Sequence, residues 1–132
     1  EDKTVLVLVS DNQAALRKRP GKGLLAGLYE LPNLEGHLKP DQVLDYVKSE
    51  GLSPIRIQEL PAAKHIFSHI EWHMAGYVVK VEEPEIPDRQ TDEAAQAASP
   101  EKLFFVEKQQ MEEKYSIPAA FAAYTEYFKH RY

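Results

Sequence analysis

The first apolar run of this 132-residue chain, TVLVLVS at residues 4–10, constrains its fold more than any other feature. The run has the length of a strand and is rich in valine. It lacks the alternation of a half-exposed strand, so it predicts a central strand buried on both faces. A chain of this length can bury the core that such a strand needs. We therefore expect one domain over residues 1–132, built around a central sheet.

Nine prolines divide the rest of the chain into short elements. A helix is expected over 39–52, because Pro40 marks its start, Gly51 is suited to its C-terminal cap, and an apolar stripe lies between them. Further strands are expected over 13–20, near Pro32, over 54–60 and over 103–106, with a hairpin over 62–81, a long loop over 82–100 that includes a turn of helix at 92–98, and helices over 107–115 and from Pro118 onward. This order predicts an α+β domain with a mixed sheet flanked by helices. The side chains expected to face the core are Trp72, Met74, Tyr115, Phe121, Tyr124 and Phe128.

The charge is unevenly distributed along the chain. The net charge is −5, and residues 82–93 carry all of it, because they hold six acids and one arginine. A basic segment without acids covers residues 12–29, and its cations are candidates for DNA phosphate contacts: Arg17, Lys18, Arg19 and Lys22. The alternative is a solvated strand edge, where basic residues discourage aggregation.

Two absences exclude whole classes of chemistry. The chain has no cysteine, which excludes disulfides, thiolate metal sites, iron–sulfur clusters and a cysteine nucleophile within it. Its apolar runs are also much shorter than the ~20 residues that span a bilayer, so no membrane partner is expected.

The expected hairpin turn carries Phe67, Ser68 and His69 where turns usually carry Gly, Asn, Asp or Pro. A ring followed by two hydrogen-bonding side chains suggests recognition of a ligand. The alternatives are a core position for Phe67 and an ordinary turn position for Ser68. His65, His69 and His73 recur every four residues, but strand spacing puts them on one face and about 13 Å apart per step, too far for a single metal ion.

Several motifs resemble known families. GLLAGLYELPNLEG (23–36), followed by a capped helix ending in EGL, resembles the start of a Nudix-type domain. HIFSHIEW (65–72) resembles the signature of the C-terminal domain of MutY-type adenine DNA glycosylases, and RKRPGKGLLAGLYELP (17–32) and YSIPAAFAAY (115–124) match that family as well. The likeness runs in order from residue 4 to the end of the chain, although the acidic loop 82–100 carries no family signal.

The resemblance implies a MutT-like (Nudix) fold that does not hydrolyse nucleotides and helps to recognise 8-oxoguanine opposite adenine in duplex DNA. It implies that Ser68 and His69 contact the lesion and that Phe67 supports them or wedges into the DNA. The catalytic domain, with its carboxylates and 4Fe–4S cluster, would lie upstream of this fragment, which itself would need no cofactor or metal. The implied partners are lesion-containing DNA and that glycosylase domain, and the implied setting is a monomer in the bacterial cytoplasm, acting at the nucleoid.

Two alternatives to lesion recognition remain. A Nudix hydrolase needs a helix that presents several carboxylates to Mg²⁺, in a box ending Arg-Glu-x-x-Glu-Glu-x-Gly. Ending that box at Gly51 leaves Asp45 as the one carboxylate at its Arg-Glu and Glu-Glu pairs, and counting forward from Pro32 leaves none. The other alternative is a protein-interaction module whose sheet or acidic loop docks a repair or replication partner.

Overall fold

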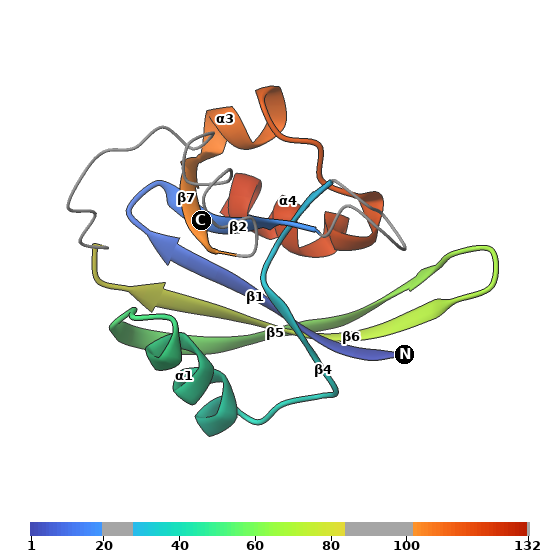
Figure 1. Ribbon diagram of the computed structural model, residues 1–132, viewed down its shortest axis with the longest axis horizontal. Coiled ribbons are helices and arrows are strands. Elements are labelled where there is room, and N and C mark those ends of the chain that lie inside the picture. Colours follow the sequence, from blue (N-terminus) through green and yellow to red (C-terminus); the bar gives the residue numbers. More distant parts are fainter. Residues whose placement is uncertain (20–27, 84–101, 132) are drawn as a thin grey trace.

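The computed structural model describes residues 1–19, 28–83 and 102–131, and within them a seven-stranded mixed sheet lies between two layers of helices. Helix α1 covers one face, and α3 and α4 cover the other (Figure 1). This confirms the expected α+β fold class. The strands are β1 (Asp2–Ser10), β2 (Gln13–Lys18), β3 (Tyr29–Glu30), β4 (Asn33–Glu35), β5 (Pro54–Ile66), β6 (Glu71–Val81) and β7 (Phe104–Glu107). The helices are α1 (Pro40–Ser49), α3 (Lys108–Glu113), the 3₁₀ helix η1 (Ala119–Phe121) and α4 (Ala122–Arg131).

Strand β1 is the buried central strand that the apolar run predicts. Its residues from Val5 to Val9 are completely shielded from solvent. It pairs in parallel with β6, and in antiparallel with β4 at one end and β2 at the other. Because side chains alternate along a strand, Val5 and Val7 pack under α4 while Leu6 packs under α1. Both helical layers are therefore fixed to the same strand.

Strands β5 and β6 form one long hairpin, and this corrects two expectations. The segment 54–60 is not a separate strand, and the hairpin does not begin at 62, because β5 runs unbroken from Pro54 to Ile66. The register shifts between Leu60 and Ala63, around Pro61. Proline cannot donate a hydrogen bond to the ladder, so it is tolerated in a strand at such a bulge. The hairpin extends past the helical layers, to the right in Figure 1.

Helix α1 confirms the expected start and end signals. Pro40 is its first residue, and the Lys39 N–H donates to the Gln42 side chain at 2.9 Å. Gly51 adopts a φ of +80° just after the helix, where a residue with a Cβ would be strained. No helix of the described residues combines the length and apolarity that crossing a bilayer requires.

The segment around Pro32 differs from expectation, and most of the expected acidic loop lies outside the residues that the structure describes. The short strand expected near Pro32 is two short strands, because β3 pairs with β2 before the proline and β4 pairs with β1 after it. The expected acidic loop 82–100 falls outside the described residues from 84 onward, as does its expected turn of helix at 92–98.

The core predicted from the sequence is confirmed: the buried residues, at most 7% exposed, include Trp72, Met74, Tyr115, Phe121, Tyr124 and Phe128. Tyr124 connects α4 to both strands of the hairpin. Its hydroxyl lies 3.1 Å from the carbonyl oxygen of Pro61 and 3.3 Å from that of Met74, to which it donates. Burial raises the pKa of Tyr124 to about 12, so the phenol is neutral at physiological pH. Its ring lies so close to β6 that a Cβ added to Gly76 would be 2.1 Å from Cε1.

Replacing Gly76 with alanine is expected to lower the free energy of unfolding by about 3 kcal/mol, because the new methyl group overlaps the Tyr124 ring. Urea denaturation measures this change. In a Tyr124→Leu background the same glycine substitution should cost only about 1 kcal/mol, since the overlapping ring is gone. Equal costs in the two backgrounds would contradict the proposed overlap.

Candidate functional site

The turn of the β5–β6 hairpin exposes Ser68 and His69 to solvent. The Phe67 N–H donates to the Ile70 carbonyl at 2.6 Å and closes the hairpin just before the turn. Turns this short favour mirror-image types with positive φ, usually built from Asn or Gly. Neither Ser68 nor His69 has a positive φ. The backbone therefore gives no reason of its own for these two residue types.

Phe67 points inward from the turn and is half-buried. Its ring centroid lies 5.0 Å from that of Trp72 and 4.7 Å from that of His65, both in edge-to-face geometry. Trp72 in turn meets Phe121 at 5.7 Å, which links the turn to η1. Such contacts contribute ~0.5–1.5 kcal/mol each beyond the burial of their area. This geometry holds the Phe67 ring against Trp72 and the core beneath it.

The opposite face of the same hairpin end carries polar side chains and one exposed isoleucine. Ile66 pairs with Glu71 across the strands and is 63% exposed. The Glu71 carboxylate lies 3.6 Å from the Lys64 ammonium and 3.1 Å from His73 Nε2. Sequence reasoning did not single out Ile66, although strand alternation beside Phe67 was a signal for it.

The histidines at intervals of four do not share a face, which corrects that expectation. His65 pairs with Trp72 and faces the α4 layer, whereas His73 pairs with Lys64 and faces the other way. The turn between them breaks the simple count. No cluster of three potential metal ligands occurs among the described residues.

The candidate phosphate-binding cations of β2 form an internal ion-pair cluster. The Glu30 carboxylate, with a side chain only 4% exposed, accepts from Arg17 Nε at 2.6 Å and from an Arg19 guanidinium nitrogen at 2.5 Å. Arg17 also donates to the Asn33 carbonyl at 2.9 Å, and the Asn33 amide donates to Glu30 at 3.1 Å. A buried carboxylate therefore offsets part of the charge of the two arginines, whose side chains are 24% and 17% exposed.

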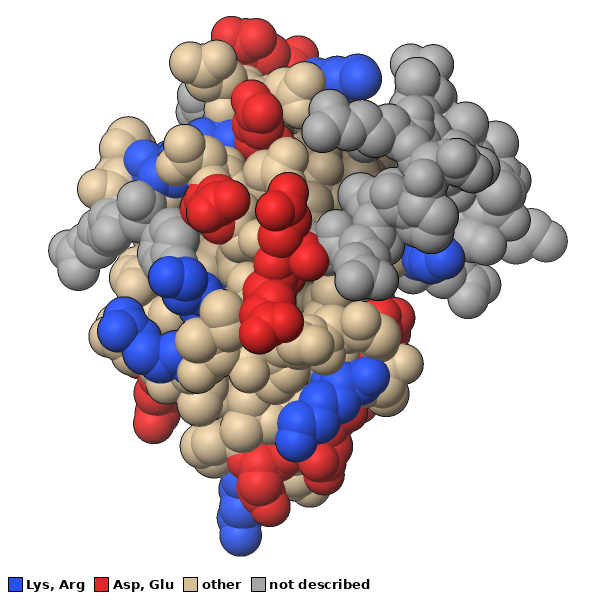
Figure 2. All heavy atoms as spheres, turned by 90° about the vertical axis from the view of Figure 1, so that its left-hand side faces the viewer, with Lys and Arg blue, Asp and Glu red and all other residues tan. Residues whose placement is uncertain are grey.

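The remaining two basic residues differ from the arginines. The Lys18 ammonium lies 5.9 Å from the centroid of the Tyr29 ring, within range of a cation–π contact. Lys22 falls outside the described residues. Figure 2 shows the side of the molecule away from the hairpin turn, where acidic side chains of the described residues occupy the centre and basic ones lie around them. That face therefore presents no broad basic surface of the kind that binds DNA strongly through phosphates.

Helix α1 does not present a carboxylate cluster to solvent. Because the helix ends against Gly51, the box counted back from that glycine is the one that the structure fits, and it places Asp45, Lys48 and Ser49 on the exposed face. A lysine among these positions repels Mg²⁺ rather than binding it. At the Arg-Glu and Glu-Glu positions of the box, the helix therefore offers one carboxylate, that of Asp45.

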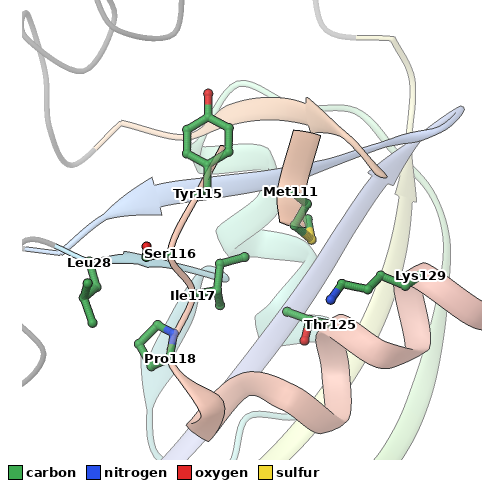
Figure 3. Close-up of a pocket in the computed structure, with 8 residues that line it drawn as sticks. All are labelled: Leu28, Met111, Tyr115, Ser116, Ile117, Pro118, Thr125 and Lys129. Carbon is green, nitrogen blue, oxygen red and sulfur yellow. The ribbon is translucent and has the colours of Figure 1, made fainter. Parts of the chain in front are cut away.

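A hollow of about 410 Å³ lies apart from the hairpin (Figure 3). Its lining comes from the segments before β3 and α4 and from α3 and α4 themselves: Leu28, Met111, Tyr115, Ser116, Ile117, Pro118, Thr125 and Lys129. The Lys129 amine points toward Thr125 (Figure 3). Its side chains offer hydroxyls and this amine as polar groups, and its described residues supply no carboxylate or imidazole for acid–base catalysis.

Comparison with known proteins assigns the fold. A family model described as NUDIX domain matches residues 4–127. The C-terminal domain of mouse MUTYH, solved in a complex with human PCNA, is similar with a TM-score of 0.68 at 20% identity, over 98% of this chain and 88% of that one. The NUDIX domain of NrtR from Shewanella oneidensis, cocrystallised with ADP ribose, is similar with a TM-score of 0.66 at 14% identity, over 98% and 86%.

A NUDIX hydrolase from Nitrosomonas europaea is also similar, with a TM-score of 0.62 at 17% identity over 96% of this chain and 86% of that one. These levels of identity establish a shared fold and nothing finer. No curated protein matches the chain by sequence.

Replacing Glu30 with glutamine is expected to lower the free energy of unfolding by about 3 kcal/mol, because two partly buried guanidinium groups lose their counter-charge. Glu35→Gln is the matched control. The Glu35 carboxylate is also in an ion pair, with Lys3, but the Glu35 side chain is 77% exposed. Loss of this ion pair should therefore lower the free energy of unfolding by less than about 1 kcal/mol. Chemical denaturation of both variants checks the prediction, and equal costs would contradict the role assigned to Glu30.

Proposed function

This chain belongs to the NUDIX domain family, and we propose that it is the non-catalytic, lesion-recognition domain of an A/G-specific adenine DNA glycosylase. In this role it reads 8-oxoguanine opposite adenine during base excision repair. The observation that carries the proposal is the hairpin turn, where Ser68 and His69 are exposed on a support formed by Phe67 and Trp72. The similarity in fold to the C-terminal domain of mouse MUTYH supports it.

Ser68 suits the edge that distinguishes the lesion from guanine. Guanine presents two acceptors, N7 and O6, in the major groove. In 8-oxoguanine N7 carries a hydrogen and C8 an oxygen, so a donor and an adjacent acceptor replace one acceptor. A serine hydroxyl accepts and donates at once, so Ser68 can accept from N7–H while it or a backbone N–H donates to O8. His69 adds one donor and one acceptor for the same edge or a nearby phosphate.

The basic residues contribute sequence-independent contacts in this proposal. Lys18, Arg17, Arg19 and Lys22 are the phosphate-contact candidates, and the two arginines share their charge with Glu30. This compensation favours weak overall affinity, so the lesion contacts decide which duplex is bound.

The wider setting is part of the same proposal. The catalytic domain, with its carboxylates and 4Fe–4S cluster, precedes this one in the parent chain and removes the mispaired adenine. The domain is a monomer, acts with that glycosylase domain on DNA in the bacterial cytoplasm, and holds no cofactor of its own. Incubated alone with a duplex containing adenine opposite 8-oxoguanine, it should release no adenine.

Protein docking is the second candidate function, and one observation favours it. The mouse MUTYH domain with the same fold was solved in a complex with human PCNA, so a surface of this fold can hold a protein partner. Nucleotide hydrolysis is a weaker candidate, because the exposed face of α1 carries Lys48 and Ser49 where carboxylates are needed. Sustained turnover of nucleoside diphosphate substrates with Mg²⁺, above a protein-free blank, would overturn that judgement.

Replacing Ser68 with alanine is expected to abolish the preference for a lesion duplex over the matching guanine duplex. A well-placed pair of base-edge hydrogen bonds discriminates by ~1–3 kcal/mol, so a preference of roughly five- to a hundred-fold should fall close to one. Fluorescence anisotropy with labelled duplexes at low salt measures both affinities.

Ser53→Ala is the control for this prediction, since Ser53 is an exposed serine just before the opposite end of β5. It should leave the preference unchanged. A lesion preference that survives Ser68→Ala, or a parent domain with no preference at all, would contradict lesion reading and favour the docking function.

A further inference from the structure

We propose that Ile66, and not Phe67, is the apolar side chain that enters the base stack beside the lesion. This inference rests on the proposed function and adds a specificity residue to it. Ile66 and Ile55 are the large apolar side chains that stand out as exposed among the described residues, at 63% and 57%. Only Ile66 lies at the hairpin turn, next to the residues that would read the base.

The pleat of β5 places the apolar side chains next to the turn on opposite faces of the strand. Side chains alternate along a strand, so His65 and Phe67 point toward the α4 layer while Ile66 points to the opposite, open face. Phe67 is held there by two ring contacts, at 4.7 and 5.0 Å. Rotating it outward into DNA would break both contacts and expose Trp72. Ile66 needs no such rearrangement, because it is already presented to solvent.

The surroundings of Ile66 suit an approach to nucleic acid. Its cross-strand neighbour, Glu71, lies within 3.6 Å of the Lys64 ammonium and 3.1 Å of His73 Nε2, so this carboxylate has nearby cationic or hydrogen-bonding partners. The Lys64 side chain is 56% exposed on the same face, and its ammonium group is of the kind that contacts backbone phosphates. The apolar side chain is therefore bordered by groups that tolerate a phosphate backbone.

Spacing connects Ile66 to the base that Ser68 would read. Two residues along a strand span at most roughly 7 Å, and successive nucleotides rise about 3.4 Å along one strand of DNA. With Ser68 on the 8-oxoguanine edge, Ile66 reaches a base step flanking the lesion. Apolar side chains inserted at such steps partly unstack them, and the burial of the side chain offsets the cost.

The test uses duplexes that carry 2-aminopurine next to 8-oxoguanine, because 2-aminopurine brightens when it unstacks. Binding of the unsubstituted chain should raise the fluorescence of 2-aminopurine. Ile66→Thr keeps the β-branched shape that suits a strand but replaces the ethyl branch of the side chain with a hydroxyl. It should remove the fluorescence rise and weaken lesion binding roughly five- to ten-fold, as expected when part of an isoleucine side chain is no longer buried. Ile66→Val should retain most of both signals.

Ile55→Thr is the matched control, because it makes the same change in the same strand at a similarly exposed site far from the turn. This variant should bind the lesion duplex and raise the 2-aminopurine fluorescence as the unsubstituted chain does. Thermal unfolding and the fluorescence of Trp72 confirm that each variant is folded.

The outcomes distinguish failure of the role inferred for Ile66 from failure of the proposed lesion-reading function. If Ile66→Thr binds and brightens like the parent while Ser68→Ala loses lesion preference, the base-stack role of Ile66 is wrong and lesion reading stands. If Ile66→Thr weakens guanine and lesion duplexes equally and leaves the fluorescence rise intact, the inference is also overturned. If neither substitution changes anything, both the inference and the proposed function fail, and Ile66 becomes a candidate contact for a protein partner.

Discussion

Parallel pairing between β1 and β6 is the interaction on which the rest of the structure depends. The ladder runs from Asp2 opposite His73 to Val9 opposite Lys80, along the whole of the buried strand. Its first pair, Asp2 opposite His73, lies close to the first residue of β6, so the core supports the hairpin almost to its turn. From there the aromatic contacts of Trp72 with Phe67 and Phe121 continue the support. The orientation of the exposed turn is therefore set by the most buried part of the molecule.

The elements that the sequence predicts well are those with a strong local pattern. The valine-rich run of β1, the capped helix between Pro40 and Gly51, and the aromatic spacing of the last helix all depend on neighbours along the chain. The bulge at Pro61 was missed because a proline usually ends a strand, and only the pairing of β5 with β6 on both sides of it keeps the strand continuous. The ion pairs of Glu30 were missed for a similar reason. They form because β3 pairs with β2, with Arg17 opposite Glu30, and a sequence pattern does not specify that pairing.

The candidate site was predictable in chemistry and less so in geometry. The residue types at 67–69 stood out because a turn did not need them, and the structure exposes Ser68 and His69 at a hairpin turn as expected. Which apolar side chain faces outward depends on the phase of the pleat at the turn. Phe67 packs on Trp72 on the side of the hairpin that faces α4. Because side chains alternate along the strand, Ile66 then lies on the open face. Packing on one side of the hairpin thus determines what the other side offers to a ligand.

The most direct test of the central claim is an NMR titration of the isotope-labelled domain with short duplexes that carry either 8-oxoguanine or guanine opposite adenine. This method detects weak binding residue by residue. Lesion reading predicts amide shifts at Ser68 and His69 that are larger with the lesion duplex than with the guanine duplex. Equal shifts with both duplexes, centred on Arg17 and Lys18, would contradict it and leave the domain as a contact to the DNA backbone alone.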